Sequence, residues 1–171
     1  MFNFRQISAA FALSCIFGGV LAGQETEATP KLAFVLNTKA ESGKDIKGIA
    51  EAKAVSALID GSIGEVIKVI SGTGKFDVLD KKGVSAAMKK LNLKDIMTEE
   101  QAISLGKELD AANVLNLDIA AKGTSATLDA RLVNVATGAS VSASEPISDI
   151  KSQALPAVKK VCSKLLGIEL L

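Results

Sequence analysis

The chain has 171 residues, a formal net charge of +1 and no His, Trp or Tyr. A charge this close to neutral does not favour nucleic acid or an anionic membrane as a partner. The absence of His removes the commonest general base and the commonest metal ligand. We therefore predict that the protein is not an enzyme and uses no cofactor or metal.

Residues 1–22 have the features of a secretory signal peptide. One charge, Arg5, precedes an apolar run from Ile7 to Leu21, and that run is shorter than the roughly 20 residues of a membrane-spanning helix. The small residue at the end of the run predicts cleavage between Ala22 and Gly23. A leader that is retained as an anchor is the alternative, and the favoured interpretation is export to the periplasm.

The two cysteines suggest no disulfide within the mature chain. Cys15 raises the option of an outer-membrane lipoprotein, but Ala12-Leu13-Ser14 is a poor recognition sequence for lipidation and apolar residues still follow the cysteine. This option is therefore disfavoured. Cys162 would be the only cysteine left after processing. Its place in the apolar pattern of the last helix predicts a small core residue, and a disulfide bridge to another molecule is the alternative.

The next segments alternate between extended and helical patterns. Residues 23–30 are expected to form a polar tether and residues 31–171 a single domain, because about 150 residues suit one domain. Lys31–Leu36 is a compact apolar run after its first residue, and it predicts an interior strand covered on both faces. A polar loop over Asn37–Lys44 follows, and Asp45 is a candidate N-cap.

Residues 46–70 carry apolar side chains at helical spacing. Gly61 and Gly64 interrupt this helix and predict either a kink or close packing on the sheet. The Gly-containing segment Ser71–Lys75 lacks the spacing of a phosphate-binding loop and precedes a strand, so it predicts a turn.

Phe76–Asp80 predicts the second strand and Val84–Leu91 a short helix with Met88 facing inward. Thr98 and Gln101 have the spacing of a capping box, which marks the start of the next helix. The last helix has Ile150, Leu155, Val158, Val161, Cys162 and Leu165 on its apolar face. Pro156 either kinks this helix or begins its regular part.

Residues 114–141 predict two consecutive β-hairpins that form the rear of a sheet. Placing Ile119 opposite Leu128 leaves a tight turn at Gly123-Thr124 but sets Asp118 opposite Asp129. A slip of two residues would instead pair Asp118 with Arg131 and lengthen the loop. The tight turn is favoured, but the alternation does not decide between them. The second hairpin is expected to turn at Thr137-Gly138.

The elements therefore follow the order β-α-β-α-α-β-β-β-α. Early helices and a late meander predict the α+β class, with a single mixed sheet of about five strands and helices packed on it.

Three motifs resemble the CsgG-like and LpoB-like envelope proteins, whose domain is similar to the N-terminal domain of TolB. Residues 76–81 (FDVLDK) resemble a strand of pattern F-x-V-x-D/E-R, and residues 105–115 (LGKELDAANVL) resemble a helix end of pattern LGK-x-L-G-A-D. Residues 130–138 (ARLVNVATG) resemble a hairpin of pattern A-R-L-V-D-V-x-T-G. The residues that carry the motifs are Phe76, Val78, Asp80, Gly106, Arg131, Thr137 and Gly138.

The resemblance implies structural roles for these residues and no catalytic residue. Phe76 and Val78 would fill the core, Gly138 would supply a turn, and Arg131 would anchor a polar contact between strands. The chain departs from the patterns at Lys81, Asp110 and Asn113, where Arg, Gly and Asp are usual.

The resemblance also implies a function through protein contact. The first interpretation is a non-catalytic periplasmic adaptor in cell-envelope assembly, with an envelope protein of unknown identity as its partner. The alternative is a component of a curli-type outer-membrane secretion complex, which would require self-association and peripheral association with the outer membrane. A hydrolase with two carboxylates is the third option, but no motif places two of them in a cleft, since Asp77 and Asp80 fall on opposite faces of their strand.

Overall fold

The computed structural model describes residues 28–40, 46–96, 98–122 and 125–170, and it describes the side chains in these ranges except those of 38–40, 46–56 and 122. The strands are β1 (Lys31–Ala40), β2 (Asp77–Val78), β3 (Asn113–Lys122), β4 (Ser125–Asn134) and β5 (Ser140–Ile147). The helices are α1 (Ile46–Gly72), α2 (Lys81–Lys90), α3 (Glu99–Glu108) and α4 (Ile150–Leu166). The predicted signal peptide, Asp45 and the Gly123-Thr124 turn lie outside the described residues.

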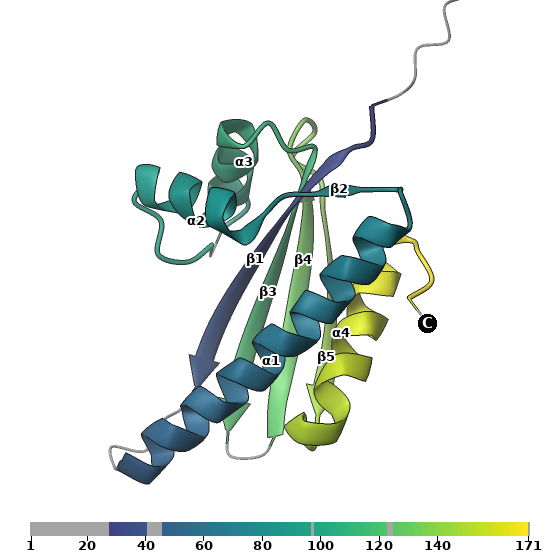
Figure 1. Cartoon of the computed structure of the whole chain (residues 1–171). Coiled ribbons are helices and arrows are strands. Elements are labelled where there is room, and N and C mark those ends of the chain that lie inside the picture. The colour runs from purple at the N-terminus through teal and green to yellow at the C-terminus, as the bar shows by residue number, and fades with distance from the viewer. Residues whose placement is uncertain (1–27, 41–45, 97, 123–124, 171) are drawn as a thin grey trace, which may run out of the picture.

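The five strands form one mixed sheet in the order β2-β1-β3-β4-β5. β1 is parallel to both β2 and β3, whereas β3, β4 and β5 form an antiparallel meander. Figure 1 shows this sheet with α1 and α4 lying side by side in front of it. The α+β class and the order of the elements predicted from the sequence are confirmed.

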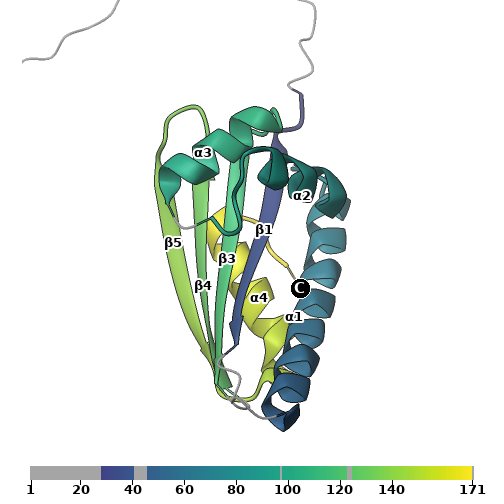
Figure 2. The ribbon, with the colours of Figure 1, turned by 90° about the vertical axis from the view of Figure 1, so that its left-hand side faces the viewer.

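The two faces of the sheet are covered to different extents. α1 and α4 pack on one face over the larger core, which includes Leu32, Ile59, Leu117, Leu128 and Val158. α2 and α3 pack on the other face over a smaller core, which includes Val84 and Leu105. Figure 2 shows that α2 and α3 cross only the upper part of that face. The lower part of the second face is therefore open.

β1 is longer than the sequence predicts and β2 is shorter. The predicted loop begins at Asn37, but the strand continues to Ala40 because β1 pairs with β3 as far as Ala121. β2 contributes only two residues, which pair with Lys31 and Leu32. Beyond Leu32, β1 is therefore the edge of the sheet among the described strands, so the predicted interior position holds only for its first residues.

The register of the first hairpin is the one that implies a tight turn. Ile119 lies opposite Leu128, and Lys122 and Ser125 are the last described pair before the turn. The slipped alternative, in which Asp118 faces Arg131, is wrong. Aligning the apolar faces of β3 and β4 over the α1–α4 core outweighs the unfavourable opposition of two carboxylates, because a different register would rearrange every buried pair.

α1 follows the predicted apolar spacing with one exception, and α4 decides between the alternatives for Pro156. Among the described side chains, the apolar face of α1 includes Ile59, Ile63 and Val66, but Leu58 is 43% exposed. Gly61 and Gly64 have no neighbour within 4 Å of a built Cβ, so close packing does not explain them. Pro156 lies inside α4 and does not begin it.

None of the helices in the described ranges is long and apolar enough to cross a bilayer.

Candidate interaction surface

The uncovered part of the sheet forms a surface of mainly polar side chains. We call it the open face, and it consists of Asp118, Ala120, Thr127, Asp129, Arg131, Ser142, Ser144 and Pro146. All of these residues are exposed except Asp118, which is half-buried. Figure 2 shows the three strands that carry them running below α3.

Strand alternation creates this surface and α3 limits it. Along β4, Thr127, Asp129 and Arg131 point to the second face and are exposed, because successive side chains alternate between the faces. The next residue on the same face, Val133, is fully buried in the core beneath α3. The change from polar to apolar residues on one face of one strand therefore marks where the helical cover begins.

A buried amide network lies at the upper border of the open face. The Asn37 side chain donates to the Ile96 carbonyl at 3.2 Å and the Asn116 amide oxygen at 3.1 Å. The Asn116 side chain also donates to the Ile96 carbonyl, at 3.1 Å. Both asparagines are buried, with 3% and 5% exposure. The network joins the α2–α3 connection to β1 and β3 and satisfies polar groups that would be costly to bury alone.

The same two asparagines hold the carboxylate of Asp118. Asn37 donates to one carboxylate oxygen at 2.9 Å and Asn116 donates to the other at 2.8 Å. Because the Asn37 amide has two N–H groups and three acceptors, one N–H is shared between two of them. Hydrogen bonds to an ionised acceptor are stronger than those between neutral groups. Asp118 therefore presents a carboxylate in a fixed orientation at the border between the covered and open parts of the sheet.

Arg131 lies in the middle of the open face. It is paired with Asn116 on β3 and Ser142 on β5, but its exposed side chain forms no hydrogen bond or ion pair with a described residue. The expected polar contact between strands is thus absent from this part of the chain. An exposed guanidinium on a rigid strand, close to Asp129, is suited to contact a carboxylate of a partner.

The first family motif combines core residues with a helix cap. Phe76 and Val78 are half-buried against the α1–α4 core. Asp80 was expected at the end of a strand, but its carboxylate accepts hydrogen bonds from the backbone N–H groups of Lys82 at 2.6 Å and Gly83 at 2.9 Å. Asp80 is therefore the N-cap of α2, and this helix begins three residues earlier than predicted.

The second motif places a glycine where α3 meets the sheet. A Cβ on Gly106 would lie 2.2 Å from Cγ2 of Val135 and 3.2 Å from Cγ2 of Val114. A methyl group does not fit at the first distance, so glycine allows α3 to approach the strands closely. The helix itself begins with the capping box of Thr98 and Gln101, as predicted.

The third motif forms the turn between β4 and β5. The Asn134 side chain accepts hydrogen bonds from the backbone N–H groups of Ala136 and Thr137 and from the Thr137 hydroxyl. Gly138 has a φ of 72°, in the left-handed region that glycine adopts readily. Ala22 and Gly23, the predicted cleavage residues, lie outside the described residues.

The remaining chemistry of the described residues is limited. In these ranges, no group of three or more Cys, Asp or Glu side chains is placed to hold a metal ion. Cys162 is free and buried, and burial raises the pKa of its thiol to about 12. Lys31 forms an ion pair with Asp110 at 2.8 Å, and this contact lowers the pKa of the Asp110 carboxyl.

Sequence reasoning did not identify Asn37, Asn116 and Asp118 as a group. The available signal was the period-two row of polar residues on β3, in which Asn116 and Asp118 share a face. Nothing local indicated that Asn37, which lies 79 residues before Asn116, would join them.

No protein-family model and no curated protein sequence matches the chain. Among solved structures, the chain is similar to the LpoB C-terminal domain from Salmonella enterica, with a TM-score of 0.48 and 19% identity over 72% of this chain and 86% of that chain. It is also similar to LpoB from Escherichia coli, with a TM-score of 0.47 and 22% identity over 70% of this chain and 57% of that chain. The lipoprotein GNA1162 from Neisseria meningitidis gives a TM-score of 0.44 and 17% identity over 83% of this chain and 100% of that chain. These values are too low to assign the chain to a family.

Proposed function

We propose that the protein is a non-catalytic adaptor of cell-envelope assembly that works in the periplasm and binds an envelope protein through the open face. The proposal rests on the three LpoB-like motifs, on the leader over residues 1–22, and on the geometry of the sheet. The single observation that carries it is the exposed Arg131 on a rigid, uncovered strand beside the fixed carboxylate of Asp118.

The geometry favours recognition of a protein surface. The hydrogen-bonded ladders of three strands set the shape of the open face, so binding would order little of this chain. Residues that are held in place before binding lose little conformational entropy in the complex. Arg131 and Asp118 offer opposite charges at defined positions, which is typical of contacts that select one partner.

Photocrosslinking in the native host tests the proposal. A photoreactive residue at Thr127 or Ser142 should form a covalent product with an envelope protein, and Arg131→Glu should abolish that product. A photoreactive residue at Lys164, which is exposed on α4, is the matched control and should not form it. A product that consists only of two copies of this chain would contradict the adaptor and indicate self-association, and identical products from all three positions would contradict the open face.

A curli-type secretion complex is not proposed as a second function, because no feature of the described residues favours it. Fractionation of the same cells tests peripheral association with the outer membrane. If the adaptor reaches the membrane only through its protein partner, Arg131→Glu should release it from the membrane fraction.

A further inference from the structure

The edge of β1 beyond Leu32 has unused backbone hydrogen-bonding groups. Asp77 N–H donates to the Pro30 carbonyl at 3.1 Å and Leu79 N–H donates to the Leu32 carbonyl at 3.0 Å. Even-numbered residues of β1 therefore direct their backbone groups to this edge, and Phe34 and Leu36 are the next two. No described residue pairs with them there, and such an edge is a template for another strand.

The two edges of the sheet differ in their protection. The edge strand β5 contains Pro146, which cannot donate to an added strand. β1 contains no proline and no charge from Phe34 to Asn37, and Lys39 is its one charged residue beyond Leu32. Figure 1 shows the lower part of β1 as the border of the sheet, without a strand beyond it.

A groove of about 400 Å³ lies along this open edge. The α1 wall consists mainly of Ile63, Gly64 and Ile67, and the α2 wall consists mainly of Val84, Ser85 and Met88. Because the walls lie on opposite faces of the sheet, a strand added beside β1 would direct alternate side chains into each wall. Strands that are covered on both faces carry uninterrupted apolar runs, so the groove suits a short apolar run.

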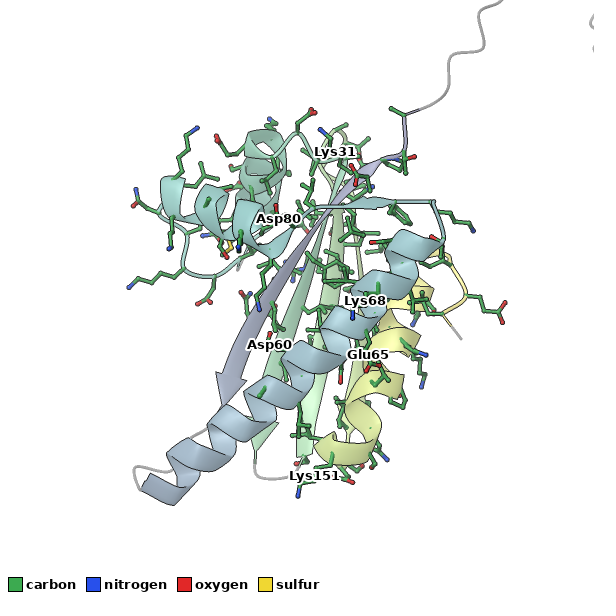
Figure 3. The ribbon with its side chains drawn as sticks, viewed as in Figure 1. Lys31, Asp60, Glu65, Lys68, Asp80 and Lys151 are labelled. Carbon is green, nitrogen blue, oxygen red and sulfur yellow. The ribbon has the colours of Figure 1, made fainter. Side chains whose placement is uncertain are left out.

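An ion pair joins the two walls across the groove. Lys81 on α2 lies 3.2 Å from Asp60 on α1, and their side chains are 78% and 46% exposed. Figure 3 labels Asp60 on α1 and Asp80, the residue before Lys81, at the start of α2. Ion pairs with this exposure contribute little to stability, so an entering strand could displace this one at small cost.

The helix that forms the α2 wall of the groove is positively charged. α2 carries four lysines and no acidic residue. Lys90 pairs with Glu108, but Lys82 and Lys89 form no ion pair with a described residue. They lie one helical turn on either side of Ser85, on the same flank of the helix. Charge complementarity therefore favours acidic residues beside the apolar run.

We propose that the groove between α1 and α2 binds an extended segment of a partner protein, which adds a strand to the open edge of β1 and carries a short apolar run flanked by acidic residues. The added strand continues the line of β2 and receives backbone hydrogen bonds from Phe34 and Leu36. This inference deepens the proposed adaptor function by naming a second contact, separate from the open face.

Two glycines of α1 give a matched pair of variants for the test. Both Gly61 and Gly64 have open space around a built Cβ, and leucine at either position improves helix propensity. Only Gly64 lines the groove. Gly64→Leu should therefore fill the groove without unfolding the chain, and Gly61→Leu is the control for the same chemical change in the same helix.

The probe is a displayed peptide library of pattern Asp-Glu-X-X-X-X-Glu-Asp, in which X is Val, Ile, Leu, Phe or Met. The full chain and its Gly61→Leu variant should enrich the same sequences, and Gly64→Leu should weaken their binding at least tenfold. A second library with lysine at the four acidic positions should not be enriched. Absence of enrichment, or equal enrichment on both glycine variants, would overturn the proposal.

Backbone methylation separates strand addition from simple apolar binding. The best peptide is made in two forms, N-methylated at the first and third X or at the second and fourth X. In an added strand only one set of N–H groups faces β1, so one form should lose binding by about fivefold for each lost hydrogen bond and the other should bind normally. Equal effects of the two forms would contradict strand addition.

The crosslinking experiment and the peptide library together distinguish this inference from the proposed function. If the crosslink from Thr127 or Ser142 persists while the library is not enriched, the groove proposal falls and the adaptor proposal stands. If the library is enriched on the groove while no envelope protein is crosslinked from the open face, the adaptor surface falls and the peptide-binding groove stands.

Discussion

Asp118 on β3 lies directly opposite Asp129 on β4. Both side chains point to the second face of the sheet, where Asn37 and Asn116 donate hydrogen bonds to the Asp118 carboxylate. Asp129 is exposed and receives no hydrogen bond from a described residue. The hairpin thus keeps two like charges across a strand pair, and the amide network supports only one of them.

We expect that removal of this repulsion stabilises the protein. Opposite charges at facing positions contribute roughly 0.2–1 kcal/mol and like charges are unfavourable. Asp129→Lys should therefore raise the free energy of unfolding in urea by a few tenths of a kcal/mol to about 1 kcal/mol, and 1 M salt should reduce the gain. Asp129→Asn, which only removes the repulsion, should give a smaller gain, whereas a loss of stability in both variants would contradict this account.

The close approach of α3 predicts a large effect of one methyl group. Gly106→Ala would place Cβ 2.2 Å from Val135, and overpacking of this kind costs about 1–3 kcal/mol. Gly61→Ala, which meets no neighbour, should instead stabilise α1 by up to about 1 kcal/mol. In a double-mutant cycle measured by urea unfolding, Val135→Ala should recover part of the loss in Gly106→Ala, and simple additivity would argue against the contact.

The amide network should contribute to stability as well as to the shape of the open face. Asn116→Ala removes three hydrogen bonds, the two that Asn116 donates to the Ile96 carbonyl and Asp118 and the one that it accepts from Asn37. It leaves Asp118 with one amide donor. We expect a loss of about 1–3 kcal/mol in the free energy of unfolding, because partners in a buried network lose their hydrogen bonds. Ser142→Ala on the open face should change stability by less than about 0.5 kcal/mol.

Variants of Asp80 test whether this motif residue stabilises the protein as the N-cap of α2. Asp80→Ala should destabilise the protein by about 1 kcal/mol, whereas Asp80→Asn should retain most of the stability, because asparagine is also a good N-cap. Thermal unfolding monitored by circular dichroism gives both values. If both variants also kept the crosslink from Thr127, Asp80 would have no role in partner binding.

The buried thiol of Cys162 should be unreactive until the protein unfolds. At pH 9.0, the ordinary thiol pKa, half of an exposed thiol is ionised, but burial raises the pKa of Cys162 to about 12 and keeps it protonated. Iodoacetamide should therefore label the chain in urea and not in the native state. Rapid labelling of the native protein would place the thiol at the surface.

The same pKa shift predicts the sign of a pH dependence. Between pH 9.0 and about 12 the folded chain holds a proton that the unfolded chain loses, so the free energy of unfolding should fall as pH rises, by at most about 1.4 kcal/mol per pH unit. The difference in stability between the natural chain and Cys162→Ala should shrink over this range, because the variant lacks the thiol while its lysines titrate in the same way.

Local patterns predicted most of the elements because they depend on neighbouring residues. The capping box of Thr98 and Gln101 places the start of α3 through contacts only three residues apart. The alternation on β3 and β4 placed Ile119 opposite Leu128 in the favoured register, since one face of each strand had to be buried. Asp80 was assigned to a strand because a carboxylate before two lysines looks the same at a strand end and at a helix cap.

The sequence by itself determined which residues of β3 and β4 face the α1–α4 core, where α3 begins and the order of the elements, because these properties follow from periodicity and capping over a few residues. Only the tertiary structure decided that β1 continues through Asn37, that α3 needs Gly106, that Arg131 is uncovered and that the edge of β1 is open. These features depend on segments far apart in the chain. How far a helix covers a sheet is set by the packing of whole elements, which no short pattern encodes.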